Sequence, residues 1–303
     1  MNIADFEAFL AIADTRNLSK AADMLFLSQS TVSYRLKRLE TELGVELVVR
    51  SRGGRFIELT PKGIKFIDTA LQWINLWKLT QQFREMESSI TLRVGQVDWF
   101  IAYPFEKLYL ALLQEAPNLK LDIRTGHSLP ISEMINNMEL DVGFVVHPIF
   151  SNQLIYKPIF RDPLVMVCSK RAGLLESTIH PRSLDARKEV FWKYYGDLRI
   201  WHDQWWDSAS TSEIQIDFSV PMSFKFLSNP SYWLVSPRSI AEDQVRKNPD
   251  LGIYEFSAPP PDIVCYSVQR NMPSQYVVPA IQMLMNFLET HSSLFALQPF
   301  MVI

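Results

Sequence analysis

The sequence is short of the features on which disulfide-bonded, zinc-binding and membrane proteins depend. Only two cysteines, Cys168 and Cys265, occur in 303 residues. That is too few for a disulfide framework or a metal cluster, and it indicates buried thiols in a reducing compartment. No apolar run approaches the roughly 20 residues needed to cross a bilayer. Asp5 and Glu7 interrupt the region where a signal peptide would be apolar. We therefore expect a cytoplasmic protein with no membrane partner.

Motifs of catalysis are also missing. The five histidines, at positions 127, 147, 180, 202 and 291, have no metal-ligand spacing such as His-Glu-x-x-His. There is no Gly-x-Ser-x-Gly nucleophile turn, and the ten glycines form no phosphate-binding loop. We expect no metal site, no cofactor and no catalytic residues, and therefore no enzyme.

Positive charge, by contrast, is concentrated in one short stretch. The whole chain has a net charge of −3, yet residues 28–62 hold seven Lys or Arg against four Glu, whereas residues 1–27 hold two against four Asp or Glu. An uneven distribution of this kind is typical of a surface that meets a polyanion.

Residues 19–43 predict two short helices joined by a tight turn, with Ser19 and Ser28 as N-caps and Gly44 as the C-terminal stop. The second helix has an apolar stripe with spacings of 4, 3 and 4: Val32, Leu36, Leu39 and Leu43. Its other side combines short hydroxyls near the start with cations further along, which suits a major groove. An ordinary amphipathic surface helix is the alternative. The candidate DNA-binding residues here are Ser28, Gln29, Ser30, Thr31, Ser33, Tyr34, Lys37 and Arg38.

The flanking segments predict a helix before this pair and a hairpin after it. Residues 3–14 have helical apolar spacing and should pack behind the two helices. Beyond Gly44 the apolar period changes to two, at Leu47 and Val49 and again at Ile57 and Leu59. The tip between these strands has cations that can contact phosphates or the minor groove, unless it is only a solvated turn. These candidate residues are Arg50, Arg52 and Arg55.

A long helix should begin at Pro61 and run to about Phe83. Its apolar stripe of Ile64, Ile67, Leu71 and Ile74 has a wide aromatic flank. Such a helix pairs with its copy in a second chain, or it belongs to an intramolecular core. Residues 85–89 predict a polar hinge, and from residue 90 onward strands and helices alternate, which favours parallel sheets covered by helices.

Several separated segments resemble one family. FLAIADTRNLSKAA (9–22), LSQSTVS (27–33), LETELG (39–44) and LTPKG (59–63) resemble the N-terminal domain of LysR-type transcriptional regulators. PNLKL (117–121) and LDVGF (140–144) are similar to that family's effector domain, and segments 160–167 and 233–238 match it more loosely. Ser30 stands where the family often has Pro, and Tyr34 where a polar or basic residue is usual.

The resemblance implies an α/β protein with an N-terminal winged helix-turn-helix, a long linker helix and a two-lobed, periplasmic-binding-protein-like effector domain. The implied domains are a DNA-binding domain at 1–60, a linker or dimerisation helix with its hinge at 61–89, and an effector-binding domain at 90–303. Lobe 1 would take 90–161 and 266–303, and lobe 2 would take 162–265. The implied partners are double-stranded DNA, a small-molecule effector, and copies of the chain as a homodimer through the linker helix and as a homotetramer.

Ligands of α/β lobes sit at the carboxyl ends of strands and at helix N-termini. The residues expected there, and hence in the effector site, are Gln96, Asp98, Trp99, His127, Ser128, Val146, His147, Trp201 and His202. Asp98 beside the indole of Trp99 suits a neutral or cationic ligand better than a dicarboxylate, although His127 could accept an acid group. For the tryptophans at 192, 201, 205 and 206, core packing or an interface is favoured over a ligand-binding aromatic box.

Three interpretations remain open. The favoured one is a sequence-specific transcriptional regulator controlled by a small molecule that binds between two lobes. A solute-binding protein or enzyme on the same lobes would have no need of residues 1–62. In the third, the C-terminal domain of a DNA-binding protein serves only to form oligomers.

Overall fold

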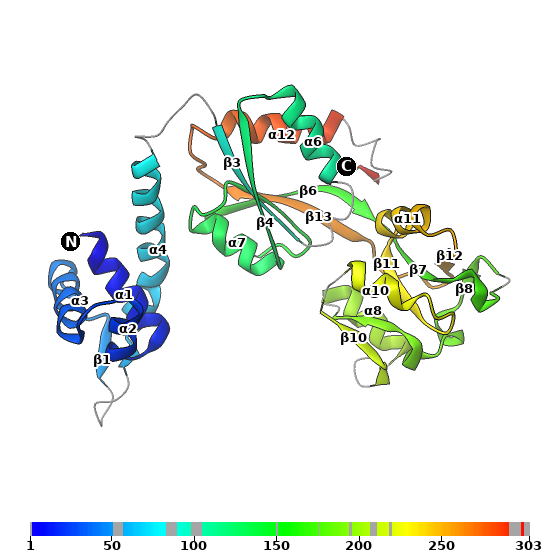
Figure 1. Ribbon diagram of the computed structural model, residues 1–303, viewed down its shortest axis with the longest axis horizontal. Helices are drawn as coiled ribbons and strands as arrows, with labels where there is room; N and C mark the ends of the chain where they lie inside the picture. Colours follow the sequence, from blue (N-terminus) through cyan, green and yellow to red (C-terminus); the bar gives the residue numbers. More distant parts are fainter. Residues whose placement is uncertain are drawn as a thin grey trace. The chain divides into compact units, whose positions relative to one another are not determined.

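The computed structural model describes residues 2–50, 57–82, 90–97, 105–149, 151–174, 176–193, 196–206, 211–217, 220–290 and 298–299. The chain folds into two compact units (Figure 1): residues 1–88, with which 136–139 group, and residues 89–135 with 140–303. None of the described helices is long and apolar enough to cross a membrane. Among the same residues, no group of three or more His, Cys, Asp or Glu could hold a metal ion.

The first unit begins with three helices, α1 (Ile3–Thr15), α2 (Leu18–Met24) and α3 (Gln29–Leu43). The Ser28 hydroxyl accepts the N–H of Thr31 at the start of α3, as expected, and Gly44 ends that helix in the left-handed region at φ 67°. The cap of α2 is Asn17 rather than Ser19, because the Asn17 side chain accepts two backbone N–H groups in the first turn. The apolar stripe of α3 faces the core, which it shares with α1.

A short hairpin, β1 (Val48–Arg50) and β2 (Ile57–Leu59), follows α3. The face on which Val49 lies differs from the one that its alternation with Leu47 predicts. Val48 pairs with Leu59 and Val49 pairs with Glu58, so Val49 lies on the exposed side with 41% of its surface accessible. Leu47 is buried and precedes the strand, so Leu47 and Val49 do not share the buried face that a period of two would give them. A shift of one residue exchanges the two faces of a strand.

Helix α4 (Pro61–Gln82) packs against α1. The Phe6 ring stacks on that of Trp73, with ring centroids 4.4 Å apart, and lies 5.9 Å from Phe66. Ala70 and Ile74 are buried in the same core. Ile74 therefore belongs to the intramolecular core and not to a seam with a second chain, which corrects the sequence-based stripe. Other apolar side chains of α4 remain exposed, namely Ile64 (57%), Leu76 (51%) and Trp77 (42%).

The second unit contains a six-stranded sheet in the order β14-β6-β13-β5-β3-β4. Its strands are β3 (Ile90–Val97), β4 (Leu119–Gly126), β5 (Val142–Val145), β6 (Leu154–Asp162), β13 (Ile263–Arg270) and β14 (Gln298–Pro299). Strands β3, β4 and β5 are parallel, and β13 runs antiparallel to β5 and β6. Helices α6 (Phe105–Glu115) and α12 (Val278–Thr290) lie on one face, and α7 (Ser128–Asn136) on the other (Figure 1).

The same unit has a second sheet, in the order β11-β7-β12-β8. It consists of β7 (Leu164–Ser169), β8 (Thr178–Ile179), β11 (Trp233–Pro237) and β12 (Leu251–Phe256), and a parallel pair, β9 (Val190–Trp192) with β10 (Ile214–Ile216), lies beside it. Helices α8 (Gly196–Trp205), α10 (Val220–Phe226) and α11 (Arg238–Lys247) complete this lobe, with short 3-10 turns at 170–172, 181–183 and 186–188. Here β7 is antiparallel to both β11 and β12, in contrast to the parallel sheet expected from strand–helix alternation.

The chain passes between the two sheets twice. Pro163 joins β6 to β7, and residues 257–262 lead from β12 back to β13. The expected boundary between 265 and 266 falls inside β13. Each sheet has its own buried apolar core, so the second unit consists of two lobes joined by two adjacent connections.

Candidate nucleic-acid interface and ligand pocket

The start of α3 presents a cluster of hydroxyls to solvent. Ser28, Gln29 and Ser30 are exposed. The Ser28 Oγ lies 2.9 Å from the Ser30 Oγ and 2.7 Å from the Thr31 Oγ1, and the Ser19 hydroxyl donates to the Gln29 Oε1 at 3.3 Å. Because these groups are small and polar, another molecule can approach the N-terminus of α3 closely.

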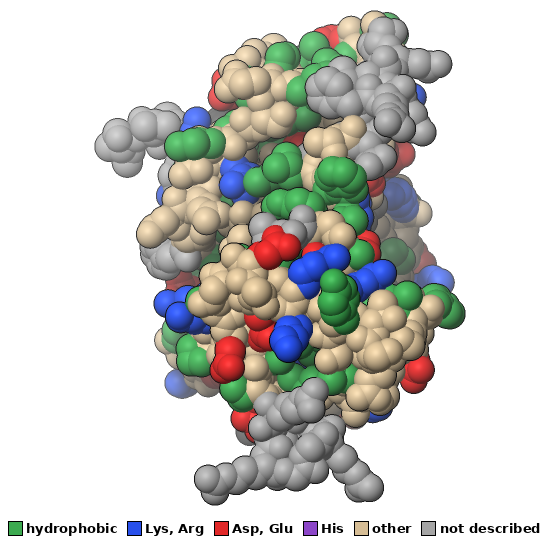
Figure 2. All heavy atoms as spheres, turned by 90° about the vertical axis from the view of Figure 1, so that its left-hand side faces the viewer, with side chains coloured by type: hydrophobic (Ala, Val, Ile, Leu, Met, Phe, Trp, Pro, Cys, Tyr) green, Lys and Arg blue, Asp and Glu red, His purple; other side chains and the backbone are tan. Residues whose placement is uncertain are grey.

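One turn further along α3, larger side chains stand on the surface. Tyr34 is 64% exposed, Lys37 is exposed, and Ser33 is half-buried. Figure 2 shows Lys and Arg side chains gathered around an exposed hydrophobic side chain on one face of the molecule, with Asp and Glu nearby. The charge on this face is therefore mixed.

Arg38 is held by the protein itself. Its guanidinium bonds through two nitrogens to the carboxylate of Asp5, which is fully buried. The hydrogen bond to Asp5 raises the pKa of Arg38 above its ordinary value. The guanidinium also lies 5.7 Å from the ring centre of Tyr34. Arg38, expected to contact DNA, thus joins α3 to the start of α1, and this contact orients the helix.

Of the three hairpin arginines expected to contact DNA, the structure describes only the backbone of Arg50. Arg50 pairs through its backbone with Ile57 at the end of β1, and its side chain lies outside the described residues, as do Arg52 and Arg55 altogether.

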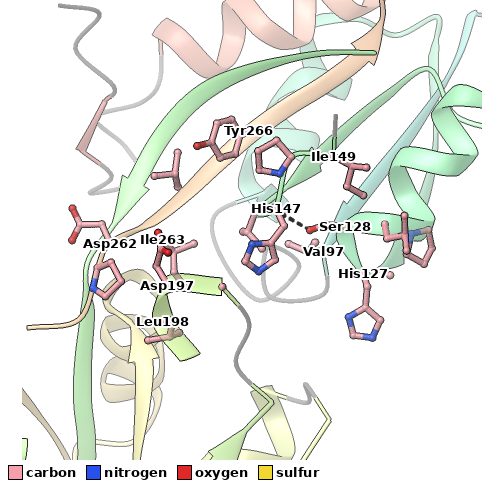
Figure 3. A pocket seen from close by; sticks show the side chains of 18 residues that line it. Val97, His127, Ser128, His147, Ile149, Asp197, Leu198, Asp262, Ile263 and Tyr266 are labelled. Atoms are coloured by element: carbon pink, nitrogen blue, oxygen red, sulfur yellow. Dashed lines mark hydrogen bonds between the residues drawn. The ribbon is translucent and has the colours of Figure 1, made fainter. Parts of the chain in front are cut away.

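The second unit contains a pocket of about 960 Å³ (Figure 3). Its walls come from the ends of β3, β4 and β5, the start of α7, the start of α8, and the segment that enters β13. Its lining residues are Val97, Gly126, His127, Ser128, Leu129, Pro130, Val146, His147, Pro148, Ile149, Gly196, Asp197, Leu198, Pro261, Asp262, Ile263, Val264 and Tyr266. Both lobes therefore contribute, and the site lies at the carboxyl ends of parallel strands, where such folds bind ligands.

Ser128 fixes the geometry of the wall formed by the first lobe. Its Oγ accepts the backbone N–H groups of Val146 and His147, each at 3.3 Å, and its carbonyl accepts the Ser132 hydroxyl at 2.8 Å. These bonds connect the start of α7 with the end of β5 and direct the His147 ring into the pocket (Figure 3). Burial lowers the pKa of His147, against an opposite and smaller effect of Asp197. The ring is therefore neutral at neutral pH.

Gly196 begins the wall from the second lobe. It has a φ of 58°, and a Cβ at this position would lie 3.7 Å from the His147 ring. A residue with a side chain would be strained in this backbone conformation. Gly196 therefore permits the left-handed backbone turn at the start of α8, after which Asp197 and Leu198 line the pocket.

Four of the nine residues expected in the effector site line the pocket: His127, Ser128, Val146 and His147. Gln96 is buried and accepts the Tyr109 hydroxyl at 2.5 Å, so it belongs to the core of the first lobe. Asp98 and Trp99 lie outside the described residues.

The remaining two expected residues, Trp201 and His202, do not line the pocket. Residues 198–202 belong to α8 and do not form a strand that ends at the site, because their apolar side chains follow a helical period. Trp201 donates to the Ala258 carbonyl at 3.1 Å. His202 is fully buried, with its Nε2 2.8 Å from the carboxylate of Glu189, which is also buried. Both residues therefore serve the core of the second lobe.

Sequence reasoning missed Asp197, Asp262 and Tyr266 as lining residues. The start of α8 at Gly196 and Asp197 is the kind of helix N-terminus that could have been identified. Asp262 and Tyr266 line the site because the return connection passes beside it, which no local pattern indicates.

The tryptophans of the second lobe form a packed aromatic cluster, as favoured from the sequence. Trp192, Trp201 and Trp206 are buried. The rings of Trp201 and Trp206 are 5.6 Å apart, and the Trp206 ring lies 5.1 Å from that of Trp233. Trp205 packs against the cluster from its edge.

Both cysteines are buried. Burial raises the pKa of the Cys168 thiol to about 11 and that of Cys265 well above its ordinary value. Neither thiol is activated as a thiolate at neutral pH.

Helices α1 to α4 with their hairpin, and the two lobes with a pocket between them, define a winged helix-turn-helix protein with a ligand-binding unit. Family models agree with both parts. Residues 3–64 match the bacterial regulatory helix-turn-helix protein, lysR family, and residues 87–292 match the LysR substrate binding domain. The chain belongs to the LysR family of transcriptional regulators, which confirms the resemblance and the α/β class.

Relatives and solved structures are similar along much of the chain. The HTH-type transcriptional regulator YofA of Bacillus velezensis is 29% identical over 59% of this chain and 62% of its own length. The transcriptional activator IlvY of Haemophilus influenzae is 24% identical over 68% of this chain and 71% of its own. A full-length OxyR from Pseudomonas aeruginosa has a TM-score of 0.62 at 21% identity, covering 95% of each chain. CbnR complexed with its target DNA has a TM-score of 0.62 at 17% identity, covering 96% of this chain and 99% of its own.

Proposed function

We propose that this chain regulates transcription by binding double-stranded DNA sequence-specifically through residues 1–60 and a small-molecule effector through residues 90–303. Residues 61–89 join the two as linker helix and hinge. The exposed face of α3, with its hydroxyls and cations, supports the DNA-binding part of this proposal, in a chain that belongs to the LysR family. The pocket of about 960 Å³ supports the effector-binding part. A pocket of this size with a few convergent polar groups favours ligand sensing over a domain that serves only to form oligomers.

The base-reading residues are proposed to be those that α3 leaves accessible. Ser30, Ser33 and Tyr34 are positioned to approach base edges, and Lys37 to approach a phosphate. Arg50, Arg52 and Arg55 are proposed to contact the sugar–phosphate backbone or minor groove beside the helix. Arg38 has the separate task of orienting α3 through Asp5.

The chain is proposed to act as a homodimer through α4, and as a homotetramer with contacts from the effector domains. Support comes from the apolar side chains that the first unit leaves uncovered. Ile64 is 57% exposed, and Leu71 is half-buried and does not belong to the apolar core of its unit. These two residues are seven apart, so they lie on the same side of the helix. A second copy of α4 could cover both.

We further infer that the chain is not an enzyme and acts in the cytoplasm. Its relatives are named as regulators and activators of transcription. Ligand recognition, which is the use proposed for the pocket residues, requires no reaction.

The test begins with selection of genomic fragments by the full chain, followed by sequencing. An enriched motif is the expected result, and absence of any enrichment would reject the regulator. On that motif, Ser33→Ala should change base preference by about 1–3 kcal/mol at one position. Lys37→Ala should weaken binding to all sequences and reduce the salt slope by about one. Lys78→Ala, an exposed lysine on α4, is the matched control and should change neither.

A further inference from the structure

Among the described residues that line the pocket, the only Asp, Glu, Lys or Arg side chains are acidic. Asp197 and Asp262 contribute two carboxylates, while the other polar side chains are His127, Ser128, His147 and Tyr266. None of the described lining residues is Lys or Arg. In Figure 3, Asp197 and Asp262 lie on one side of the pocket and Ser128 and His127 on the other, with His147 between them.

The lack of Lys and Arg among the lining residues does not come from the residues that the structure leaves undescribed. All eighteen Lys and Arg residues between positions 90 and 303 belong to the described part of the chain. The segments outside it, such as DWFIAYP (98–104), YY (194–195) and DSAS (207–210), hold no Lys or Arg, and the first and last of these each hold an aspartate. The arginine of α8 that is nearest to Asp197 in sequence, Arg199, is paired with Asp203 at 2.6 Å. Among the described residues of the second unit, therefore, no lysine or arginine lines the pocket.

Two helix N-termini could still attract an anion, and both are weakened here. The first turn of α8 contains Asp197, whose full negative charge exceeds the helix's partial positive charge. The first turn of α7 includes Pro130, which has no backbone N–H to offer. The N–H groups of Val146 and His147 already donate to Ser128. Two carboxylates at one site would repel a carboxylate ligand.

The rest of the wall suits an apolar body. Val97, Leu129, Ile149, Leu198 and Ile263 line the space, together with the ring of Tyr266. An aromatic ring and apolar side chains favour the methylenes or ring of a ligand, and the face of a tyrosine ring attracts a cation. One end of the ligand would then meet carboxylates while the remainder meets apolar surface.

We propose that the effector is a hydrophobic organic amine, bound as its ammonium ion against Asp197 and Asp262 with its apolar body between Ile149, Ile263 and Tyr266. This assignment rests on the proposed function, because it takes the pocket to be the effector site. Asp197 and Asp262 are then the residues that select a cation over an anion. Both are exposed side chains, so their substitution leaves the cores of the lobes intact.

The experiment is calorimetric titration of the full chain with matched probes that differ only in charge. One set is 2-phenylethylamine, 2-phenylethanol and phenylacetate; a second is tryptamine, tryptophol and indole-3-acetate; a third is hexylamine, hexanol and hexanoate. We expect at least one amine to bind more tightly than its alcohol, and its carboxylate to bind most weakly. Asp197→Asn and Asp262→Asn should each weaken amine binding by about tenfold without affecting the alcohol. Asp250→Asn, which removes an exposed carboxylate of the same lobe that does not line the pocket, is the control and should change nothing.

Each other result would overturn the assignment. A carboxylate that binds better than its amine, an amine whose affinity survives both Asn variants, or no binding by any probe at millimolar concentration would each reject a cationic effector. Selection of genomic fragments by the same preparation separates the two proposals. An enriched DNA motif together with carboxylate binding would leave the regulator standing and replace the ligand class, whereas amine binding without any motif would reject the regulator alone.

Discussion

Asp162 provides a quantitative test of the connection between the lobes. It is the last residue of β6, one position before the crossing at Pro163, and only 6% of its surface is exposed. Its carboxylate accepts the backbone N–H of Ser239 at 3.2 Å and the Ser239 hydroxyl at 2.5 Å, at the start of α11. Burial raises the pKa of Asp162 from 3.8 to about 6, although the bonds from Ser239 oppose the shift.

The sign of the effect follows from linkage. The folded chain holds the proton of Asp162 more tightly than the unfolded chain, so the group stabilises the fold fully below its unfolded pKa. That stability is lost as pH rises through the folded pKa of about 6. A rise of about two pKa units corresponds to about 3 kcal/mol in total. Roughly 1.4 kcal/mol of this should disappear between about pH 5 and about pH 7.5.

The variant Asp162→Asn removes the titration. The free energy of unfolding of the variant minus that of the native chain should rise by roughly 1.4 kcal/mol from about pH 5 to about pH 7.5, because the difference cancels all other titrating groups. Urea unfolding of the full chain, followed by tryptophan fluorescence, reports on the second lobe, where Trp192, Trp201 and Trp206 lie. Asp250→Asn, at a carboxylate that is 71% exposed, is the control. If the two unfolding curves moved in parallel with pH, Asp162 would not be a buried proton-binding group and the reasoning would fail.

Two further predictions concern the first unit. A Cβ at Gly63 would lie 2.0 Å from the Leu47 carbonyl oxygen, so Gly63→Ala should destabilise this unit by roughly 3 kcal/mol and abolish DNA binding. The control is Gly126→Ala, where a Cβ has open space and should be tolerated. Equal melting temperatures for the Gly63→Ala and Gly126→Ala variants would contradict the tight packing of α4 on the hairpin. The double variant Ile64→Asp, Leu71→Asp should convert the proposed dimer into a monomer in light scattering, while Lys65→Asp on the same helix should not. A native chain that is itself a monomer at micromolar concentration would reject the dimer.

The sequence predicted the first unit well because its elements depend on local signals. The N-cap Ser28, the left-handed Gly44 and the stripe of α3 are each readable within a few residues, and each is present. Where the capping rule allowed two candidates, Asn17 was overlooked in favour of Ser19. The alternation of Leu47 and Val49 does not show that Leu47 precedes β1, so it did not reveal that Val49, opposite Glu58, lies on the exposed face.

Long-range contacts decided the rest. Nothing near Arg38 in the sequence indicates Asp5, thirty-three positions away, as its partner. Ile74 fits an intermolecular seam as well as it fits the core beside Phe6, and only the packing of α4 on α1 distinguishes the two. In the pocket, His127, Ser128 and His147 follow from the rule that strand ends bind ligands, whereas Asp262 depends on the path of the returning connection.

The carboxylate of Asp5 has three tasks at once. It accepts the backbone N–H of Asn2 at 2.9 Å, it occupies the first turn of α1, and it holds the guanidinium of Arg38 on α3. The first turn of α1 and the proposed groove-reading helix are therefore connected by a single side chain. The rotation of α3 about its own axis, and with it the set of side chains that the helix presents, is thus fixed from outside the helix by a residue of α1.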